Sequence, residues 1–250
     1  MLPNMNAFKF PVMVATIERR LLVNWRVDPD VVAGMLPDPL RPQTANGYAV
    51  VGVCLIRLGN LRPAGMPGGV GMCTENAAHR VSVEWDEGGQ RRHGVYIPRR
   101  HSASRATVAL GGRVFPGVHR RASFDVRETG DEQRVAFRGE DVEVGVDLAV
   151  AQEWPGGRLF GDLAEASAFF AGGTAGYSTG RDPGWLDGLE LRTDRWRVEP
   201  TVVRRATSTL LDALPTATFD HALLMRDLPA TWHALPPLEV GTSGHWWSAA

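Results

Sequence analysis

Hydrophobic and polar residues alternate along most of the chain, with the two-residue period of half-buried β-strands. Turns such as Glu87-Gly88-Gly89 separate neighbouring segments closely enough for antiparallel hairpins. The pattern therefore predicts a mainly β protein with a few short helices, built around an antiparallel sheet or barrel. The alternating segments are 51–55, 81–85, 95–97, 122–126, 135–137, 142–148, 189–198 and 218–225.

Three short segments carry helix signals. Asp28 can cap the first of them, and Pro29 suits its first turn. Asp162 and Glu165 have the spacing of a capping box at the start of the second. Pro215 follows the third and would end it. The predicted helices are 29–36, 163–170 and 207–214.

Two stretches without a regular pattern, 61–71 and 172–184, are predicted to be loops. The first is rich in glycine and proline and is long enough to form a lid or a loop at the mouth of a barrel. Neither has the character of an interdomain linker, because strand-like patterns continue on both sides without a change of composition. One domain over residues 1–250 is the simplest interpretation.

The composition is that of an ordinary globular protein: 44% of residues are hydrophobic, 22% are charged, and the net charge is −1. This balance gives no attraction to nucleic acid or to an anionic membrane. No stretch reaches about 18 apolar residues, and the N-terminal segment lacks the charge pattern of a signal peptide. Cys54 and Cys73 have no metal-ligand spacing and indicate no disulfide framework. We expect a cytoplasmic protein, and the sequence leaves open whether it forms a homo-oligomer.

Lysine is almost absent from the chain. Lys9 is the only one, and the other 26 of the 27 basic residues are arginines. Arginine cannot act as an amine nucleophile, because its pKa above about 12 leaves no free lone pair at neutral pH. Such a nucleophile could come only from Lys9 or from the N-terminus.

Three segments carry a resemblance to a known family: IERRLLVNWRVDPDVVAGMLPDPL at 17–40, GMCTEN at 71–76 and GGRVFPGVHR at 111–120. In order and spacing they resemble the acetoacetate decarboxylase superfamily. Within it, segments such as GVYIPRR and FFAGGTAGYS are similar to the bacterial YqjF-like group, the domain of unknown function 2071. The resemblance covers most of the chain. It implies an acetoacetate decarboxylase-like fold, a cone-shaped β-barrel that encloses a cavity.

The same resemblance implies that this chain lacks the lysines on which the family's chemistry depends. In acetoacetate decarboxylases one lysine forms a Schiff base with the ketone, and a second lysine and apolar walls lower its pKa. The family carries these lysines in a Tyr-Pro-Lys-Lys segment, where this chain has FPGVHR at 115–120. Both lysine positions are empty, so we expect the fold of the family without its iminium chemistry.

The resemblance also assigns candidate site residues. Glu75 matches the carboxylate of the family's Tyr-Thr-Glu segment, and the family's cavity arginine falls on Arg19 or Arg20, between which the sequence does not decide. Arg113 stands in the matching Gly-Arg pair and is a candidate for substrate binding. The family's second cavity glutamate falls at 51–53, where this chain has no acidic residue.

Each candidate has a chemical role and a plainer alternative. Glu75 in apolar surroundings would have a raised pKa suited to proton transfer, or it would be an exposed loop residue. His119 could serve as acid or base near neutral pH, or lie at the surface. The cavity arginine would hold a carboxylate with its fork of donors, or be solvated. Tyr96 begins a polar run that would either bind a carboxylate at a rim or form a solvated charged surface. This run also contains Arg99, Arg100, His101 and Arg105.

Other motifs indicate no further chemistry. GYSTG at 176–180 fits Gly-x-Ser-x-Gly, but a nucleophile elbow needs a strand before Ser178 and a helix after it. A predicted helix precedes this segment and Arg181-Asp182-Pro183-Gly184 follows it, which favours a plain loop. We expect no metal and no cofactor, because the histidines lack metal-binding spacing and no glycine-rich loop opens a helix. The histidines considered are His79, His93, His101 and His119.

Together these features predict a protein that acts on a small keto acid or related carbonyl compound without a Schiff base. Chemistry of the lyase, dehydratase, isomerase or cyclase type needs a base beside a polarised carbonyl. Glu75 would supply that base, with His119 assisting. The alternative is a non-catalytic protein of the same fold that binds a small carbonyl or carboxylate compound. Fold alone does not decide between them, so the sequence leaves open whether the protein is an enzyme.

Overall fold

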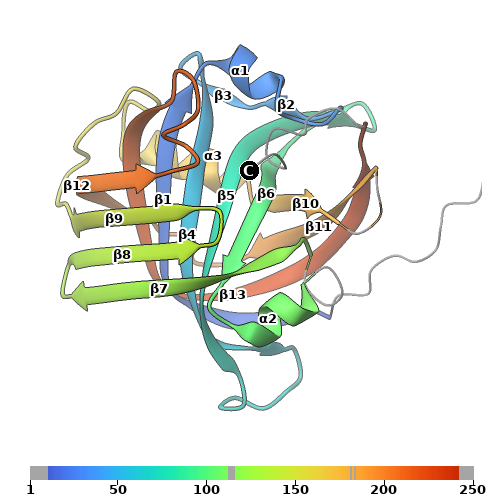
Figure 1. Cartoon of the computed structure of the whole chain (residues 1–250), viewed down its shortest axis with the longest axis vertical. Coiled ribbons are helices and arrows are strands. Elements are labelled where there is room, and N and C mark those ends of the chain that lie inside the picture. The colour runs from blue at the N-terminus through green and yellow to red at the C-terminus, as the bar shows by residue number, and fades with distance from the viewer. Residues whose placement is uncertain (1–10, 112–115, 181, 183, 242–250) are drawn as a thin grey trace, which may run out of the picture.

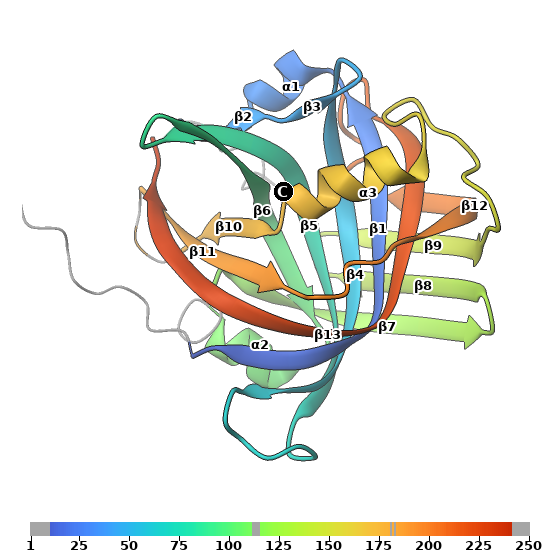
Figure 2. The same ribbon diagram turned by 180° about the vertical axis from the view of Figure 1, so that it is seen from behind.

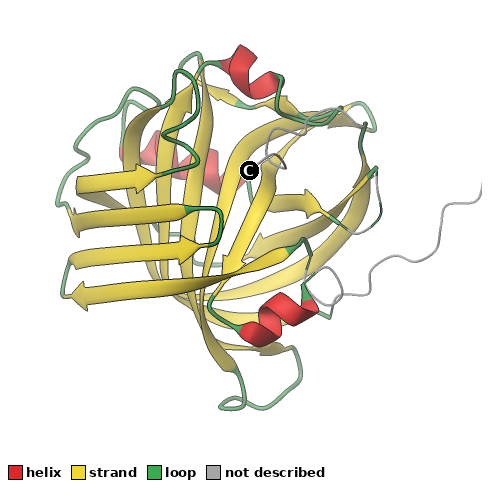
Figure 3. Cartoon of the chain, in the orientation of Figure 1, coloured by secondary structure: helices red, strands yellow, loops and turns green. Residues whose placement is uncertain are grey.

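The computed structural model describes residues 11–111, 116–180, 182 and 184–241. Strands make up most of these residues, and three short helices lie among them (Figures 1 and 3). The helices are α1 (Pro29–Ala33), α2 (Arg105–Leu110) and α3 (Leu163–Gly172). The strands are β1 (Met13–Val27), β2 (Arg41–Pro42), β3 (Thr44–Ala45), β4 (Tyr48–Pro63), β5 (Met72–Glu87), β6 (Gln90–Ser102), β7 (His119–Thr129), β8 (Glu132–Gly139), β9 (Glu143–Val150), β10 (Ala175–Thr179), β11 (Trp185–Arg192), β12 (Glu199–Ser208) and β13 (Thr218–Glu239).

The strands form one large sheet that closes on itself. Its order is β11-β10-β6-β7-β8-β9-β12-β13-β1-β4-β5-β2, and β11 also pairs with β13 and β6 with β5. The five strands β13, β1, β4, β5 and β6 therefore form a wall that two closed rings share. One ring is completed by β10 and β11, and the other by β7, β8, β9 and β12. The predicted mainly β fold is confirmed, with parallel pairings of β6 to β10 and β7 in an otherwise antiparallel sheet.

Each side of the wall packs against a different layer (Figures 1 and 2). Strands β7, β8, β9 and β12 cover one side, called here the sheet side, where Leu21 and Leu55 share a hydrophobic cluster with Phe137. Helix α3 lies against the opposite side, called here the helix side, where Leu22 shares a cluster with Phe170. Consecutive strand residues point to opposite faces, so Leu21 and Leu22 each belong to a different layer.

Two predicted helices are confirmed, together with their caps. In α1 the carboxylate of Asp28 accepts a hydrogen bond from the backbone N–H of Asp30 over 2.9 Å, but the helix ends at Ala33 rather than at 36. In α3 the carboxylate of Asp162 accepts from the backbone N–H of Glu165 over 2.8 Å, as the capping-box spacing predicts. No helix in the described residues combines the length and apolar character needed to cross a membrane.

The predicted helix over 207–214 is wrong. Strand β12 continues to Ser208, and turns follow. The backbone N–H of Ser208 donates to the carboxylate of Asp212 over 3.0 Å, and the Ser208 hydroxyl accepts from the N–H of Leu211 over 3.4 Å. Such side-chain bonds to the backbone compete with a helix. Leu211 and Leu214 are still buried in the sheet-side cluster, so their apolar spacing reflects burial in turns.

Two further elements differ from the sequence prediction. Helix α2 was not predicted, although Ser104 caps it by accepting from the backbone N–H of Thr107 over 3.2 Å. The predicted loop over 172–184 contains β10, which pairs with β6 and β11. Short elements of this kind gain their stability from tertiary pairing, which local sequence does not report.

Candidate functional site

A row of paired residues crosses the wall on its helix side. Leu22 of β1 pairs with Cys54 of β4, Cys54 pairs with Ala78 of β5, and Ala78 pairs with Arg100 of β6. Directly paired residues on adjacent strands point to the same side of a sheet. Because Leu22 belongs to the cluster around α3, Cys54 and Arg100 also face the helix side.

Two more arginines reach this side, because strand residues two positions apart point the same way. Arg20 lies two residues before Leu22, and Arg80 lies two residues after Ala78. The Nε of Arg20 donates a hydrogen bond to the Sγ of Cys54 over 3.3 Å. Strand register thus gathers three guanidinium groups and one thiol on the helix side.

Uncharged side chains hold these guanidinium groups. Arg80 is 3% exposed; it donates to the carboxamide oxygen of Asn24 and lies over the ring of Phe170, 4.9 Å from its centre. The Nε of Arg100 donates to the Oγ of Ser178 over 2.9 Å. Hydrogen bonds and aromatic faces orient these cations but do not neutralise them.

No acidic residue compensates the three charges. Within the described residues, Arg20, Arg80 and Arg100 form no ion pair with aspartate or glutamate, and the stretches outside those residues contain neither residue type. The Nε and Nη1 of Arg80 have no hydrogen-bond partner in the described part of the chain. An unpaired buried charge costs on the order of several kcal/mol. The arrangement therefore favours an anionic ligand.

The charges persist at neutral pH. Burial lowers the pKa of Arg80 and of Arg100 to about 10. The nearby Cys54 opposes this shift at both residues, and the positive charge of Arg20 adds to the lowering at Arg80. Both guanidinium groups remain protonated at pH 7, three units below that pKa. Strand register places Cys54 beside Ala78, which pairs with Arg100 and lies two residues before Arg80.

A chain of hydrogen bonds fixes Arg80 from behind. The carboxylate of Asp220 lies 2.8 Å from the Nδ1 of His221, and the Nε2 of His221 lies 3.0 Å from the Nδ2 of Asn24. Asn24 in turn accepts from Arg80. The Asn24 amide donates to Nε2 when His221 is neutral and carries its proton on Nδ1. Burial lowers the pKa of His221, whereas the charge of Asp220 raises it. This series of hydrogen bonds orients Arg80.

His119 also lies on the helix side. It pairs with Arg100 where β7 meets β6, and its Nε2 lies 3.2 Å from the carbonyl oxygen of Pro116. Burial and the charge of Arg100 lower the pKa of His119 to about 3. The imidazole is therefore neutral at pH 7, the form that can accept a proton.

Asp187 is a second titratable group on this side. It pairs with Ser178 across β10 and β11, and Ser178 contacts Arg100. Burial raises the pKa of Asp187 and Asp182 adds to the rise, while a hydrogen bond from the backbone of Gly117 opposes it. A carboxyl group that holds its proton to higher pH can serve as a proton donor.

Arg19 and Glu75 lie on the opposite side of the wall. The Nη2 of Arg19 lies 2.5 Å from the Oε2 of Glu75, and its Nη1 lies 3.2 Å from Glu128 of β7. Arg57 adds a further contact, with its Nε 3.9 Å from the Oε1 of Glu75. Arg19 is only 2% exposed. This pair joins the wall to the covering sheet and does not reach the three arginines of the helix side.

The other sequence candidates fall in different places. Tyr96 is buried in the sheet-side cluster, where its hydroxyl lies 3.4 Å from the Oγ1 of Thr179 and burial raises its pKa. Arg113 lies outside the described residues. The structure therefore brings Arg20 and His119 together on the helix side, and it separates them from Arg19, Glu75 and Tyr96.

Sequence reasoning missed most of the helix-side cluster. It treated Cys54 only as a strand residue without metal spacing, it did not single out Arg80 or Asn24, and it weighed Arg100 only as part of a polar run. A signal was present, because Asn24 and Arg80 interrupt otherwise apolar strand segments. A polar residue in a buried strand needs either a partner or a ligand.

The GYSTG motif does not form a nucleophile elbow. Ser178 lies within β10 rather than in the loop we predicted, and the next element is β11 rather than a helix. Its hydroxyl accepts the hydrogen bond from Arg100. Among the described residues, no three His, Cys, Asp or Glu side chains are gathered as metal ligands.

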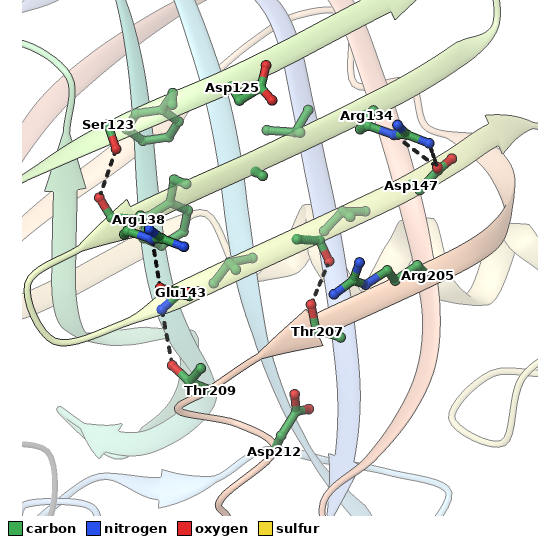
Figure 4. A pocket seen from close by; sticks show the side chains of 17 residues that line it. Ser123, Asp125, Arg134, Arg138, Glu143, Asp147, Arg205, Thr207, Thr209 and Asp212 are labelled. Atoms are coloured by element: carbon green, nitrogen blue, oxygen red, sulfur yellow. Dashed lines mark hydrogen bonds and ion pairs between the residues drawn. The ribbon is translucent and has the colours of Figure 1, made fainter.

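A shallow hollow lies over the outer face of β7, β8, β9 and β12 (Figure 4). Four of its charged side chains form two ion pairs: Arg134 lies 2.7 Å from Asp147, and Arg138 lies 2.7 Å from Glu143. Because its lining contains four acidic residues and three arginines, the hollow offers weaker attraction for an anion than the helix side does. We therefore assign the candidate site to the helix side.

Comparison with known families follows this geometry. Residues 14–228 match DUF2071, described as an uncharacterized conserved protein. The chain belongs to the DUF2071 family. The match runs from β1 into β13 and contains the wall strands that carry the arginines of this DUF2071 protein. No curated protein sequence matches the chain.

Solved structures share the fold of this DUF2071 protein at low sequence identity. An acetoacetate decarboxylase from Legionella pneumophila is 12% identical, with a TM-score of 0.63 over 97% of this chain and 93% of that one. An acetoacetate decarboxylase-like enzyme from Sphingomonas wittichii RW1 is 12% identical, with a TM-score of 0.60 over 92% and 94%. The enduracididine biosynthesis enzyme MppR, complexed with pyruvate, is 13% identical, with a TM-score of 0.54 over 92% and 90%. The predicted acetoacetate decarboxylase-like fold and the predicted membership of the DUF2071 family are confirmed.

Proposed function

We propose that this DUF2071 protein acts on a small keto acid, bound on the helix side of the wall, by acid/base chemistry without a Schiff base. One observation carries the proposal: Arg20, Arg80 and Arg100 face one side of the wall without an acidic partner in the described residues. A carboxylate is the common biological anion that matches a guanidinium fork. A protein of the same fold is described in complex with pyruvate, which is a keto acid.

The helix-side residues suggest how such a compound would be activated. A guanidinium that donates to the keto oxygen stabilises the negative charge that develops there when a neighbouring proton is removed. We assign the removal of this proton to His119, which is neutral at pH 7 but a weak base because of its low pKa, and water supplies the proton that returns. Enolisation, dehydration, retro-aldol cleavage and cyclisation all begin with this deprotonation. We do not assign it to Glu75, which the Arg19 guanidinium engages on the sheet side.

Thermal stability across a panel of compounds tests the binding step. The panel contains pyruvate, acetoacetate, longer keto acids, the matching hydroxy acids and neutral ketones such as acetone. A ligand that binds only the folded state raises the melting temperature in a saturable way. We expect keto acids to do so and neutral ketones to have no effect. A rise for ketones equal to that for keto acids would contradict a carboxylate site.

Matched arginine variants locate the binding. Arg20→Gln and Arg100→Gln each remove a charge from the helix side. We expect the apparent affinity for keto acids, obtained from the melting-temperature shifts, to fall at least about tenfold. Arg192→Gln is the control, because Arg192 is exposed and paired with Glu190 in β11. Equal loss in all three variants would indicate nonspecific electrostatics and would remove the support for the site.

Turnover separates the two functional alternatives. Proton NMR of the best-binding keto acid follows both its consumption and the exchange of its α-protons with deuterated water. Exchange that requires His119 supports an enzyme. Binding without exchange or consumption would instead support a non-catalytic protein that binds a small carbonyl or carboxylate compound.

A further inference from the structure

We propose that Cys54 is the nucleophile of the helix-side site, adding as a thiolate to the electrophilic carbon of an anionic compound held by the surrounding arginines. The keto acid as natural electrophile rests on the function proposed above. The activated thiol does not, since it follows from the position of Cys54 among the three arginines.

Hydrogen bonding and charge both converge on the sulfur of Cys54. The Nε of Arg20 donates to it over 3.3 Å. Cys54 also pairs with Ala78, which pairs with Arg100 and lies two residues before Arg80. Cationic neighbours attract a negatively charged reacting group, and sulfur is the nucleophilic atom of cysteine. The chain thus places a sulfur nucleophile on the helix side, although neither lysine position of the family motif carries lysine.

An independent observation indicates that a ligand belongs beside this thiol. Arg80, 3% exposed, lies two residues after Ala78, the residue that pairs with Cys54. It leaves its Nε and Nη1 without hydrogen-bond partners in the described residues. Asn24 fixes the remaining Nη2. Two buried N–H donors held next to a nucleophile match a carboxylate whose adjacent carbon faces the sulfur.

Two arginines of the site are partly exposed to solvent, although α3 covers this side. Cys54 itself is 7% exposed, while Arg20 and Arg100 beside it are half-buried. An anion can therefore reach the guanidinium groups and approach the sulfur from them. A reagent that carries its own negative charge should be concentrated there, since a site lined by one sign of charge raises the local concentration of the opposite ion.

The proposed step is a reversible addition. The thiolate sulfur donates its electron pair to the keto carbon, a C–S bond forms, and the C=O π bond breaks. The electron pair of that bond moves to the oxygen, where an arginine N–H stabilises it until it takes a proton from water. The product is a thiohemiketal with no change of oxidation state. Its reversal restores the thiolate and the keto acid.

Cys73 provides a matched control within the same chain. It is exposed, and its Sγ lies 3.7 Å from a carboxylate oxygen of Glu18. One thiol therefore has cationic surroundings and the other has an anionic neighbour. Neutral iodoacetamide and anionic iodoacetate differ chiefly in charge, so their relative rates report the sign of the local field at each sulfur.

The experiment measures alkylation of the full chain by both reagents. Cys73→Ser leaves Cys54 as the only thiol, and Cys54→Ser leaves Cys73. We expect the ratio of iodoacetate to iodoacetamide rates to be at least about tenfold higher for Cys54 than for Cys73, and to fall when Arg20→Gln is added to Cys73→Ser. Equal ratios at the two thiols, or no alkylation of Cys54 in the folded chain, would overturn the proposal.

Carbon NMR with pyruvate labelled at the keto carbon tests the natural electrophile. In the Cys73→Ser chain we expect a protein-dependent tetrahedral carbon signal that is absent from Cys54→Ser. Pyruvate binding with neither this signal nor an anionic rate preference would overturn the nucleophile while leaving the proposed function intact. An anionic rate preference without binding of any keto acid would retain the activated thiol and overturn the proposed function.

Discussion

Arg19 and Arg20 are adjacent in β1, yet their side chains lie on opposite sides of the wall and have opposite electrostatic surroundings. Arg19 Nη2 lies 2.5 Å from Glu75 Oε2, whereas Arg20 Nε donates to the sulfur of Cys54 and forms no ion pair in the described residues. Strand alternation alone produces this division. One arginine is thereby committed to holding two layers together, and its neighbour is left free for a ligand.

Glu75→Gln separates these two roles. The substitution removes the charge that compensates the buried Arg19, so we expect the free energy of unfolding to fall by about 1–3 kcal/mol. Keto acid affinity should be unchanged, because the three arginines of the site lie on the other side. Urea denaturation measures the first quantity and ligand-induced melting shifts the second. If the free energy of unfolding were unchanged and keto acid binding were lost, Glu75 would instead belong to the binding site.

A pair of arginine-to-methionine variants tests whether Arg80 serves ligand binding or stabilises the fold. Arg80→Met replaces an uncompensated buried cation by an apolar side chain of similar length, and we expect it to raise the free energy of unfolding by about 1–2 kcal/mol while weakening keto acid binding. Arg19→Met is the matched comparison. It removes the guanidinium that pairs with Glu75 and should lower the free energy of unfolding by about 2–3 kcal/mol. Destabilisation by both variants to the same extent would indicate that Arg80 is structural.

The sequence predicts the layers of this fold better than it predicts the site. None of the alternating segments falls on β1, but alternation correctly indicates the other strands of the wall and β7, β8 and β9, because half-buried strands must alternate. It cannot say which side receives a ligand, since both sides of the wall are covered. Arg19 and Arg20 fitted the family motif equally well for this reason. The pairing of β1 with β4 shifts between Ile17 and Arg19, a local irregularity with no signature in the residues themselves.

The polar residues of the site show the same limit. Cys54, Arg80 and Arg100 are far apart in the chain and meet only through the register of three strands. The sequence does not give the register of β4 against β5, which a longer loop joins. A short turn at Gly88-Gly89 joins β5 to β6, but their pairing shifts between His79 and Val81. His119 was found because it lies where the family motif carries its lysines. Asn24 lies inside the 17–40 segment but was not singled out there, and neither was His221, because their roles depend on the contacts of Asn24 with His221 and Arg80.

Gly52→Ala tests how closely β1 and β4 approach beside the site. A Cβ at this position would lie 2.3 Å from the backbone oxygen of Val23 and 3.1 Å from the Oδ1 of Asn24. We expect a loss of about 2–3 kcal/mol in the free energy of unfolding, with weaker keto acid binding because Asn24 orients Arg80. Gly34→Ala is the control, since its added Cβ would meet nothing closer than 3.7 Å. Comparable losses in both variants in urea denaturation would contradict this account.

Buried histidines should make the protein sensitive to mild acid. His79 is fully buried, with its Nε2 3.2 Å from the Oγ of Ser208. Burial, and to a lesser extent the neighbouring His101 and Arg99, lower the pKa of His79 from 6.5 to about 3. The unfolded chain therefore binds a proton between these values and the folded chain does not. The contribution of His79 to stability is fully present above pH 6.5 and is lost as the pH falls toward 3.

From pH 7 to pH 5 this single group should lower the free energy of unfolding by about 2 kcal/mol. His79→Gln keeps a donor for Ser208 but does not titrate, so its urea-denaturation curves should change less between these pH values, by the same 2 kcal/mol. His119, with a pKa also near 3, leaves part of the acid sensitivity in the variant. An identical pH dependence in wild type and His79→Gln would mean that the His79 ring is protonated or solvated in the folded protein.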